Sequence, residues 1–251
     1  MRNRESKTAL MAASIRAGHF AFWDSPKIFE DPFASGLAGP VWGMIGKSRL
    51  VHWISTRLLF RKFSPIWCQI LCRARYAEEC LNRALEKGID QYVLIGAGLD
   101  SFGLRRKDLR EKIKIYELDH PESQDWKRKR LRKLKLEVPK NVEYVPVDFE
   151  KKSVGDALRE SEIFFDYAMP RTRMDPEDLV FADKLQRYVT RRGEPFLSEF
   201  DPDILTQELL SLGFELVENL SKTEIERMYI AQRTDYKRIA PTYFAHLRLD
   251  R

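Results

Sequence analysis

A short apolar run that ends in two glycines is the part of this chain best suited to bind a nucleotide. Residues 92–95, Tyr-Val-Leu-Ile, are too few for a helix, and they lead through Gly96-Ala97-Gly98 into a stretch that can begin one. Glycine lacks a Cβ atom, so it allows a tight turn and lets a ligand approach the backbone closely. The pattern predicts the strand, turn and helix that open a nucleotide-binding α/β domain.

An acidic residue at the expected distance supports this prediction. Residues 114–119 read as a second strand that ends in Asp119, 23 positions after Gly96. In nucleotide-binding α/β domains, an acid about 20 residues after the glycines meets the ribose hydroxyls. We therefore expect Asp119 to bind a ribose.

The residues after the turn indicate which nucleotide is bound. A dinucleotide fingerprint would place a third glycine at position 101, where this chain has Ser101, and Asp100 follows the turn directly. A carboxylate there would repel a pyrophosphate at the helix N-terminus. It suits a ligand with an amino group, a positive charge and no phosphate, such as S-adenosylmethionine. We expect this cofactor, and a nicotinamide-dependent oxidoreductase is the least favoured alternative.

Short segments along most of the chain match one known pattern. They are Thr8-Ala9-Leu10, Ala12-Ala13, Arg16-Ala17, Asp31-Pro32-Phe33-Ala34, Arg73-Ala74-Arg75-Tyr76, residues 96–102, Tyr116-Glu117-Leu118-Asp119-His120-Pro121, residues 144–149, Gly193-Glu194-Pro195-Phe196 and Leu212-Gly213-Phe214. With them the chain resembles the class I S-adenosylmethionine-dependent methyltransferases of the leucine carboxyl methyltransferase-like group. That group includes bacterial proteins assigned as O-methyltransferases.

The resemblance implies a set of cofactor-binding residues. Asp119 would bind the ribose, and Asp148 and Phe149 would hold the adenine. The glycine turn would line the methionine part, whose carboxylate would pair with the fork of an arginine guanidinium. The full expected set is Arg73, Gly96, Ala97, Gly98, Asp100, Glu117, Asp119, His120, Asp148 and Phe149, and Arg75 replaces Arg73 if the register is off by two residues.

Two members of this set have a second interpretation. Glu117 lies on the same strand face as Asp119 and could hydrogen-bond the glycine turn, although a structural role is favoured over a catalytic one. His120 could contact the adenosine, or it could cap the strand end. The sequence assigns no catalytic residue and no metal ligand.

The interval after Asp148 is shorter than the family pattern requires. Only residues 149–161 precede the next strand-like run, 162–167, whereas two helices, a strand and their loops need roughly 40 residues. One helix, at 153–160, fits there. The chain is therefore expected to lack one helix–strand unit, with either residues 163–167 beside the first strand or another segment closing the sheet. A homologue that binds the donor without catalysis and acts as an interaction protein is the alternative function.

Composition narrows the class of protein. The 251 residues are 43% hydrophobic with a net charge of +6, which suits one α/β domain with an N-terminal extension. No apolar run is long enough for a membrane span or a signal peptide, so we expect a cytoplasmic protein. The basic run 127–135 is interpreted as the solvated face of a helix, which argues against a nucleic-acid partner. The three cysteines are expected to be buried thiols.

The predicted fold is α/β, a Rossmann-like doubly wound and mostly parallel sheet with an N-terminal helical cap. Residues 1–72 form the cap and 73–251 the Rossmann-like methyltransferase domain, in one compact unit overall. Parallel strands are expected near 91–95, 113–118 and 142–147. Further elements are expected as helices at 74–88, 176–191 and 203–212, and as an antiparallel strand pair at 214–218 and 242–249.

The function implied is methyl transfer from S-adenosylmethionine to an oxygen nucleophile. The acceptor would be a carboxylate or hydroxyl of a small molecule or of a protein C-terminus. A carboxylate needs no general base, so catalysis would rest mainly on proximity and alignment. A hydroxyl would need a base, for which the sequence offers no candidate. The oligomeric state is not assigned.

Overall fold

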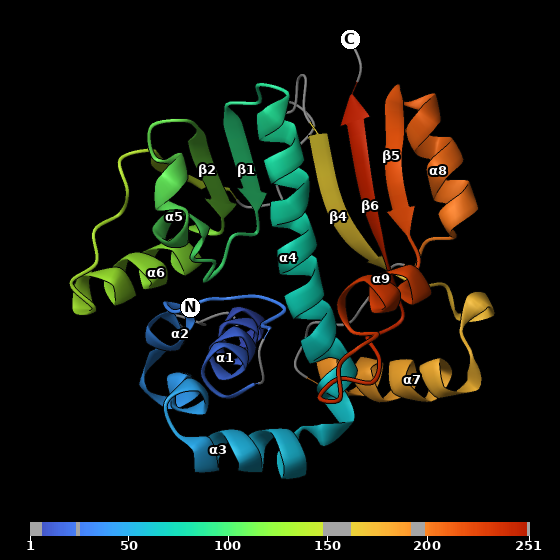
Figure 1. Ribbon diagram of the computed structural model, residues 1–251, viewed down its shortest axis with the longest axis horizontal. Helices are drawn as coiled ribbons and strands as arrows, with labels where there is room; N and C mark the ends of the chain where they lie inside the picture. The colour runs from blue at the N-terminus through green and yellow to red at the C-terminus, as the bar shows by residue number, and fades with distance from the viewer. Residues whose placement is uncertain (1–6, 24–25, 148–161, 192–198, 250–251) are drawn as a thin grey trace. The chain divides into compact units, whose positions relative to one another are not determined.

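The computed structural model describes residues 7–23, 26–147, 162–191 and 199–249, and Figure 1 shows it with its elements labelled. The chain divides into two compact units by its internal contacts. The first unit comprises residues 1–59 and 81–157, and the second comprises residues 60–80 and 158–251. The predicted boundary after residue 72, between an N-terminal helical cap and the Rossmann-like domain, stays a prediction.

The first unit holds the parallel sheet. Its elements are α1 (Lys7–Phe22), α2 (Ala34–Trp42), η1 (Gly43–Gly46), α3 (Arg49–Ile54), η2 (Ser55–Leu59), the end of α4 (Ser64–Glu86), β1 (Gln91–Ile95), α5 (Phe102–Arg105), η4 (Lys107–Leu109), β2 (Lys114–Asp119), α6 (Pro121–Lys133) and β3 (Val142–Pro146). The strands pair in the order β1-β2-β3, and both pairs are parallel. The predicted strands and their direction are confirmed.

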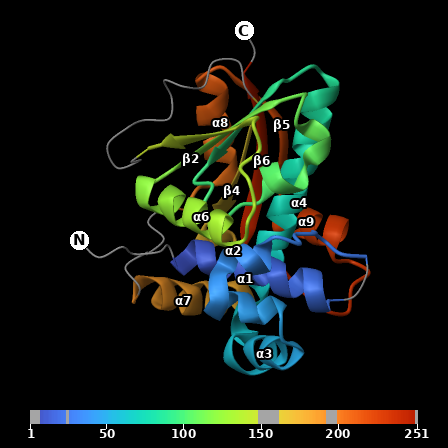
Figure 2. The same ribbon diagram turned by 90° about the vertical axis from the view of Figure 1, so that its left-hand side faces the viewer.

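Two apolar clusters stabilise this unit. One joins Leu10 and Ala13 of α1 to Leu37 of α2, Leu99 and Leu131 of α6, and Figure 2 shows these three helices beside one another. The other packs α5 against the sheet and is made of Leu81, Phe102, Leu109, Ile113 and Ile115. The N-terminal helices therefore share a core with α6 and with Leu99, in the loop after the glycine turn.

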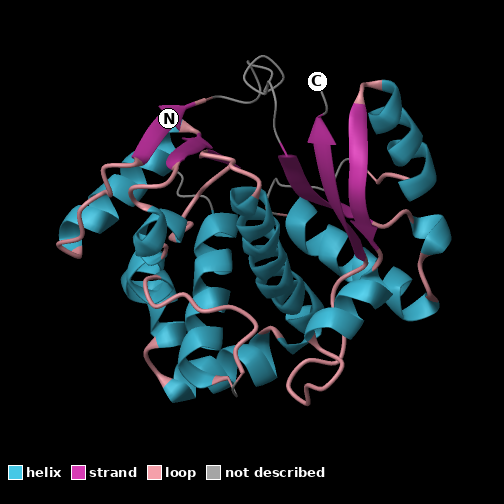
Figure 3. Cartoon of the chain, turned by 45° about the horizontal axis from the view of Figure 1, so that its top comes forward, coloured by secondary structure: helices cyan, strands magenta, loops and turns pink. Residues whose placement is uncertain are grey.

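The second unit is built on an antiparallel sheet. Its elements are η3 (Arg61–Phe63), the larger part of α4, β4 (Glu162–Ala168), η6 (Arg171–Arg173), α7 (Pro176–Thr190), α8 (Pro202–Ser211), β5 (Phe214–Leu220), α9 (Lys222–Tyr229) and β6 (Thr242–Leu249). The strand order is β4-β6-β5 and both pairs run antiparallel; strands are magenta in Figure 3. The predicted antiparallel pairing of the last two strands is confirmed. The strand at 162–168 joins the same sheet on the other side of β6.

Helix α4 begins ten residues before its predicted start at 74. Pro65 follows Ser64 in the first turn of the helix. Proline has no backbone N–H, but N–H groups in the first turn have no acceptor within the helix, so no hydrogen bond is lost. Buried residues then recur at helical spacing, Cys68, Cys72 and Tyr76, on both sides of Arg73. Because this apolar stripe is continuous, the helix continues through the position where a boundary was expected.

Side-chain caps fix the starts of the later helices, as predicted. Asp175 accepts a hydrogen bond from Asp178 N at 2.7 Å at the start of α7. Asp201 accepts one from Asp203 N at 3.0 Å at the start of α8. In each helix proline follows the cap, where its fixed φ suits the first turn. Across the described ranges, none of the helices is long and apolar enough to pass through a bilayer.

Candidate functional site

The glycine turn follows β1 and leaves open space beside its backbone. Gly96 and Gly98 have φ angles of +67° and +50°, a region that favours glycine. The N–H groups of Gly96 and Ala97 both donate to Leu118 O, at 2.8 and 3.1 Å, which fixes the turn against the end of β2. A Cβ atom added at Gly96 would meet nothing within 4 Å. A ligand could therefore approach the backbone at this position.

The carboxylate of Asp119 lies at the glycine turn. Asp119 ends β2, and its Oδ2 accepts a hydrogen bond from Gly98 N. Its Oδ1 accepts one from His120 N at 2.6 Å. The structure thus brings together the two predicted features, the turn and the second-strand acid, although they are 21 residues apart.

Asp100 is held as an anion next to the turn. Its Oδ1 accepts a hydrogen bond from Phe102 N at 2.6 Å, at the start of α5. Burial opposes its charge, but the cations Arg16, Arg105 and Lys127 outweigh burial and lower its pKa below the ordinary value. Asp100 is therefore ionised, and these three neighbouring cations balance its negative charge.

Arg16 is a buried residue of this site that the sequence analysis did not single out. It lies on α1, and its Nε donates to Asp31 Oδ2 at 2.9 Å while its Nη2 donates to Leu99 O at 2.8 Å. One guanidinium thus connects α1, the segment before α2 and the loop after the glycine turn. The signal was present, because Arg16 and Asp31 both lie in segments that carry the family resemblance.

Helix α1 also covers one side of the turn. A Cβ atom at Gly98 would lie 3.2 Å from the Cβ of Ala9, tighter than an ordinary contact. Gly98 is therefore needed both for its backbone angle and for the approach of α1. Gly96, in contrast, has its open side free.

Glu117 does not bond the glycine turn as expected. Its carboxylate is buried and pairs with the ammonium group of Lys127 on α6 at 2.5 Å. Burial raises the pKa of Glu117, although Lys127 acts in the opposite direction. Glu117 therefore has a structural role, which the sequence favoured over a catalytic one, and its described partner is Lys127 rather than the turn.

His120 caps a helix. Its Nδ1 accepts a hydrogen bond from Glu122 N at 3.3 Å at the start of α6, and the side chain is exposed. This role, the N-cap of α6, differs from both interpretations that the sequence left open, a contact with the adenosine and a cap of the strand end. His120 directly follows Asp119 in the sequence.

Two of the other expected residues, Arg73 and Arg75, have their ion-pair partners within the second unit. Arg73 belongs to the second unit, and its Nη1 pairs with Asp166 Oδ1 at 3.1 Å. The alternative, Arg75, pairs with Glu79 at 2.7 Å. Asp148 and Phe149 fall outside the described residues.

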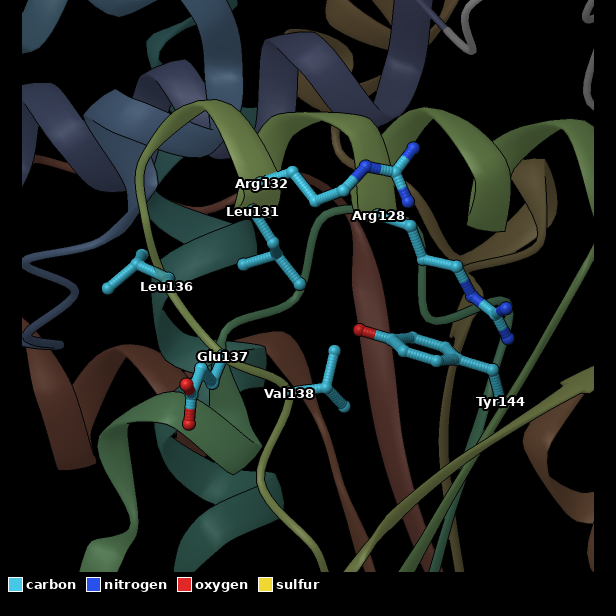
Figure 4. A pocket seen from close by; sticks show the side chains of 7 residues that line it. All are labelled: Arg128, Leu131, Arg132, Leu136, Glu137, Val138 and Tyr144. Carbon is cyan, nitrogen blue, oxygen red and sulfur yellow. The ribbon is translucent and has the colours of Figure 1, made fainter.

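A separate hollow of about 490 Å³ lies under the C-terminal half of α6 (Figure 4). Its lining side chains are Arg128, Leu131, Arg132, Leu136, Glu137, Val138 and Tyr144. The guanidinium carbon of Arg128 lies 4.7 Å from the centre of the Tyr144 ring. Of the expected cofactor residues that the structure describes, none lines this hollow.

The rim formed by Gly96, Gly98, Asp100 and Asp119 has the features that an adenosyl cofactor with a cationic sulfur requires. It offers hydrogen-bond acceptors for a ribose, open space at a glycine, and negative charge. Such a rim can bind and orient a ligand. Its carboxylates and the Nδ1 of His120 already accept backbone N–H groups.

Comparison with protein families gives one match that covers most of the chain. The model of the family described as "Leucine carboxyl methyltransferase" matches residues 9–172. A protein of Bacillus subtilis (strain 168), named "Putative S-adenosyl-L-methionine-dependent methyltransferase YktD", is 26% identical over 287 aligned residues, 93% of this chain and 94% of the relative. A Frankia alni protein with the same description is 30% identical over 59% of this chain and 50% of its own length.

Solved structures give weaker likenesses. Magnesium protoporphyrin IX methyltransferase from Synechocystis has a TM-score of 0.44 and 10% identity, over 80% of this chain and 99% of its own. The mitomycin 7-O-methyltransferase MmcR has a TM-score of 0.43 and 15% identity, over 89% and 74%. The family of this chain is therefore judged from the sequence comparisons and not from these structures.

Proposed function

The chain belongs to the leucine carboxyl methyltransferase family, and from this premise we propose that it transfers a methyl group from S-adenosylmethionine to an oxygen nucleophile. The cofactor supplies an electrophilic methyl group on a positively charged sulfur. The protein's part is to hold the donor and to align the acceptor with it. The observation that carries the proposal is the Asp119 carboxylate at the glycine turn.

Each residue of the rim has a role in holding the donor. Asp119 keeps acceptor positions on its carboxylate, beyond the N–H groups of Gly98 and His120, for the ribose hydroxyls. The open side of Gly96 admits the methionine part. Asp100, held as an anion, favours a ligand with a positive charge. Arg16 fixes the loop that carries Asp100, through Leu99 O.

A carboxylate is the acceptor that best suits this site, on a small molecule or at a protein C-terminus. A hydroxyl must lose a proton as it is methylated, whereas a carboxylate is already ionised at neutral pH. Among the described residues of the rim, Asp100, Asp119 and the Nδ1 of His120 already accept backbone hydrogen bonds. The family description, a carboxyl methyltransferase, supports the same class of acceptor.

One observation favours a second candidate, a homologue that binds the donor without catalysis and serves as an interaction protein. β3 ends at Pro146 and β4 begins at Glu162, an interval too short for two helices and a strand. The alignment with the Bacillus subtilis relative is 287 residues long, more than the 251 residues of this chain. The relative therefore carries residues that this chain lacks.

Calorimetry on the full chain tests donor binding. We expect S-adenosylmethionine and S-adenosylhomocysteine to bind, and Asp119→Ala to lower the binding free energy by about 2–4 kcal/mol, since it removes charge-assisted bonds to the ribose. The control is Asp125→Ala, an exposed acid on the following helix, which should leave affinity unchanged. Equal affinities for the Asp119 variant and the wild type would refute the site, and NAD binding alone would refute the cofactor.

A transfer assay separates the two candidates. Methyl-labelled S-adenosylmethionine is incubated with the protein and a panel of small carboxylates, hydroxyl compounds and peptides with free C-termini. Label in a base-labile methyl ester supports the carboxylate acceptor. Tight donor binding with no transfer to any acceptor supports the interaction protein instead.

A further inference from the structure

The second unit contains a compact group of three side chains of the types that bind transition metals. Cys80 Sγ, a carboxylate oxygen of Glu218 and a ring nitrogen of His246 all lie within 4.8 Å of one another. Cys80 is 4% exposed and His246 2%, whereas Glu218 is partly exposed. Two of the three side chains are thus shielded from solvent, and the third is partly accessible.

Strand register places two of these side chains opposite each other. Glu218 on β5 pairs with His246 on β6, so that both point to the same face of the antiparallel sheet. This pairing depends on an irregularity, because the register shifts between Leu216 and Glu218; without it, Val217 would lie opposite His246. Bulges of this kind redirect a side chain and are frequent next to functional sites.

Helix α4 supplies the third side chain. Tyr76 lies one turn before Cys80, and its ring packs 5.1 Å from Phe164 and 5.6 Å from Phe244, centre to centre. The Tyr76 hydroxyl donates a hydrogen bond to Glu218 Oε2. Cys80 is four residues after Tyr76 and therefore lies on the same face of α4. Its sulfur is thus within 4.8 Å of the ligand atoms of Glu218 and His246.

A second carboxylate orients the histidine. Glu162 Oε2 lies 2.8 Å from His246 Nε2, and Glu162 is on β4, two residues from Phe164, which pairs with His246. When Nε2–H donates to this carboxylate, the neutral ring keeps a lone pair on Nδ1. Metal-binding histidines commonly have this arrangement, with a carboxylate behind the ring that fixes its tautomer.

We propose that Cys80, Glu218 and His246 bind a zinc ion, oriented by Glu162. Thiolate, imidazole and carboxylate are the zinc ligands of proteins, and the thiolate disfavours magnesium and calcium. The Cys80 thiolate and the Glu218 carboxylate neutralise the two charges of the ion, and one proton leaves Cys80 on binding. Zinc bonds of about 2.0–2.3 Å place ligands roughly 3.3–3.7 Å apart, so small side-chain rotations suffice. The fourth position is left for a water molecule.

The test uses the purified full chain, reduced, with any affinity tag removed. The protein is equilibrated with zinc and its metal content is measured; cobalt(II) is titrated separately, and the thiolate-to-cobalt absorption in the near ultraviolet is recorded. We expect one zinc per chain and the absorption of a single thiolate ligand. Cys80→Ser should abolish that absorption, and Glu162→Gln should weaken zinc binding 10–100-fold.

Cys68→Ala is the matched control, because Cys68 is also buried on α4 but pairs with Cys72, 3.9 Å away. This variant should keep the zinc content and the absorption of the wild type. Circular dichroism of each metal-free variant verifies that it is folded. A folded wild type without zinc and without the thiolate absorption would overturn the proposal, as would a folded Cys80→Ser variant with unchanged absorption. Donor binding is measured separately, so failure here leaves the methyltransferase proposal unaffected.

Discussion

Lys127 and Glu117 show how the environment of a residue changes its role. In the sequence, Lys127 opens a basic run that was interpreted as a solvated helix face, and in the structure it is 2% exposed. It forms an ion pair with the equally buried Glu117 at 2.5 Å. Glu117 lies on the same face of β2 as Asp119, because only Leu118 separates the two residues.

Removing one member of this pair should strongly destabilise the protein. Lys127→Met leaves the Glu117 carboxylate buried without its cation, and we expect the free energy of unfolding to fall by about 3–5 kcal/mol. Replacing both residues with apolar ones of similar size should cost much less. Urea denaturation at neutral pH measures these differences. Lys129→Met, at an exposed position of the same helix, is the control; an equal loss in both single variants would contradict the assignment.

His52 provides a pH-dependent contribution to stability. Its ring is buried beside Phe22 and Trp23, at centre distances of 5.1 and 5.8 Å, and burial lowers its pKa to about 4. Between this value and the usual pKa of about 6.5, the unfolded chain binds a proton that the folded protein does not. Stability should therefore fall as the pH is lowered from about 6.5 toward 4.

The size of this effect can be measured by substitution. At pH 5 we expect His52 to account for about 1–2 kcal/mol of the stability lost relative to pH 7.5. His52→Phe keeps an aromatic ring and removes the titration, so its stability should depend less on pH by that amount. Urea midpoints of both proteins at the two pH values provide the comparison. Identical pH dependence in the two proteins would show that another group is responsible.

At the scale of elements, strong local signals predicted secondary structure well. The strands near 91–95, 113–118 and 142–147, and the helices that begin after Asp175 and Asp201, lie where they were expected. Each depends on a pattern only a few residues long, an apolar run or a cap followed by proline. The start of α4 was predicted ten residues late, although its buried stripe of Cys68, Cys72 and Tyr76 is continuous.

The cap of α7 allows a direct test of such a local signal. Asp175→Ala removes the acceptor for Asp178 N, and we expect the free energy of unfolding to fall by about 1 kcal/mol. The control is Lys184→Ala, an exposed residue in the middle of the same helix, which should change stability by a few tenths of a kcal/mol at most. Thermal and urea unfolding of the two variants provide the measurement. Equal stabilities of the two variants would show that the cap contributes little.

At the scale of the whole molecule, donor binding should be visible as stability. A ligand that binds only the folded protein raises the free energy of unfolding by about 2.7 kcal/mol when its free concentration is 100 times the dissociation constant. For a chain of this length, that corresponds to a rise of about 5–10 °C in the melting temperature. S-adenosylmethionine should produce this shift in the wild type, and Asp119→Ala should reduce it at the same concentration. An equal shift with NAD would contradict the assigned cofactor.

The sequence by itself determined the glycine turn, the strand that precedes it, the acid that ends the second strand, and the capped helices. These features follow from backbone sterics and from spacing within a few residues, so that their pattern can be recognised without the rest of the molecule. Asp100 beside the turn already favoured S-adenosylmethionine as the cofactor, and the family resemblance added the order of the motifs along the chain.

Only the tertiary structure decided how distant residues meet. Arg16 reaches Leu99 O across 83 positions, Lys127 is buried against Glu117, and a register shift in β5 places Glu218 opposite His246. Each depends on strand register or on helix packing, which local sequence does not encode, because a shift of one residue moves a side chain to the other face of a sheet.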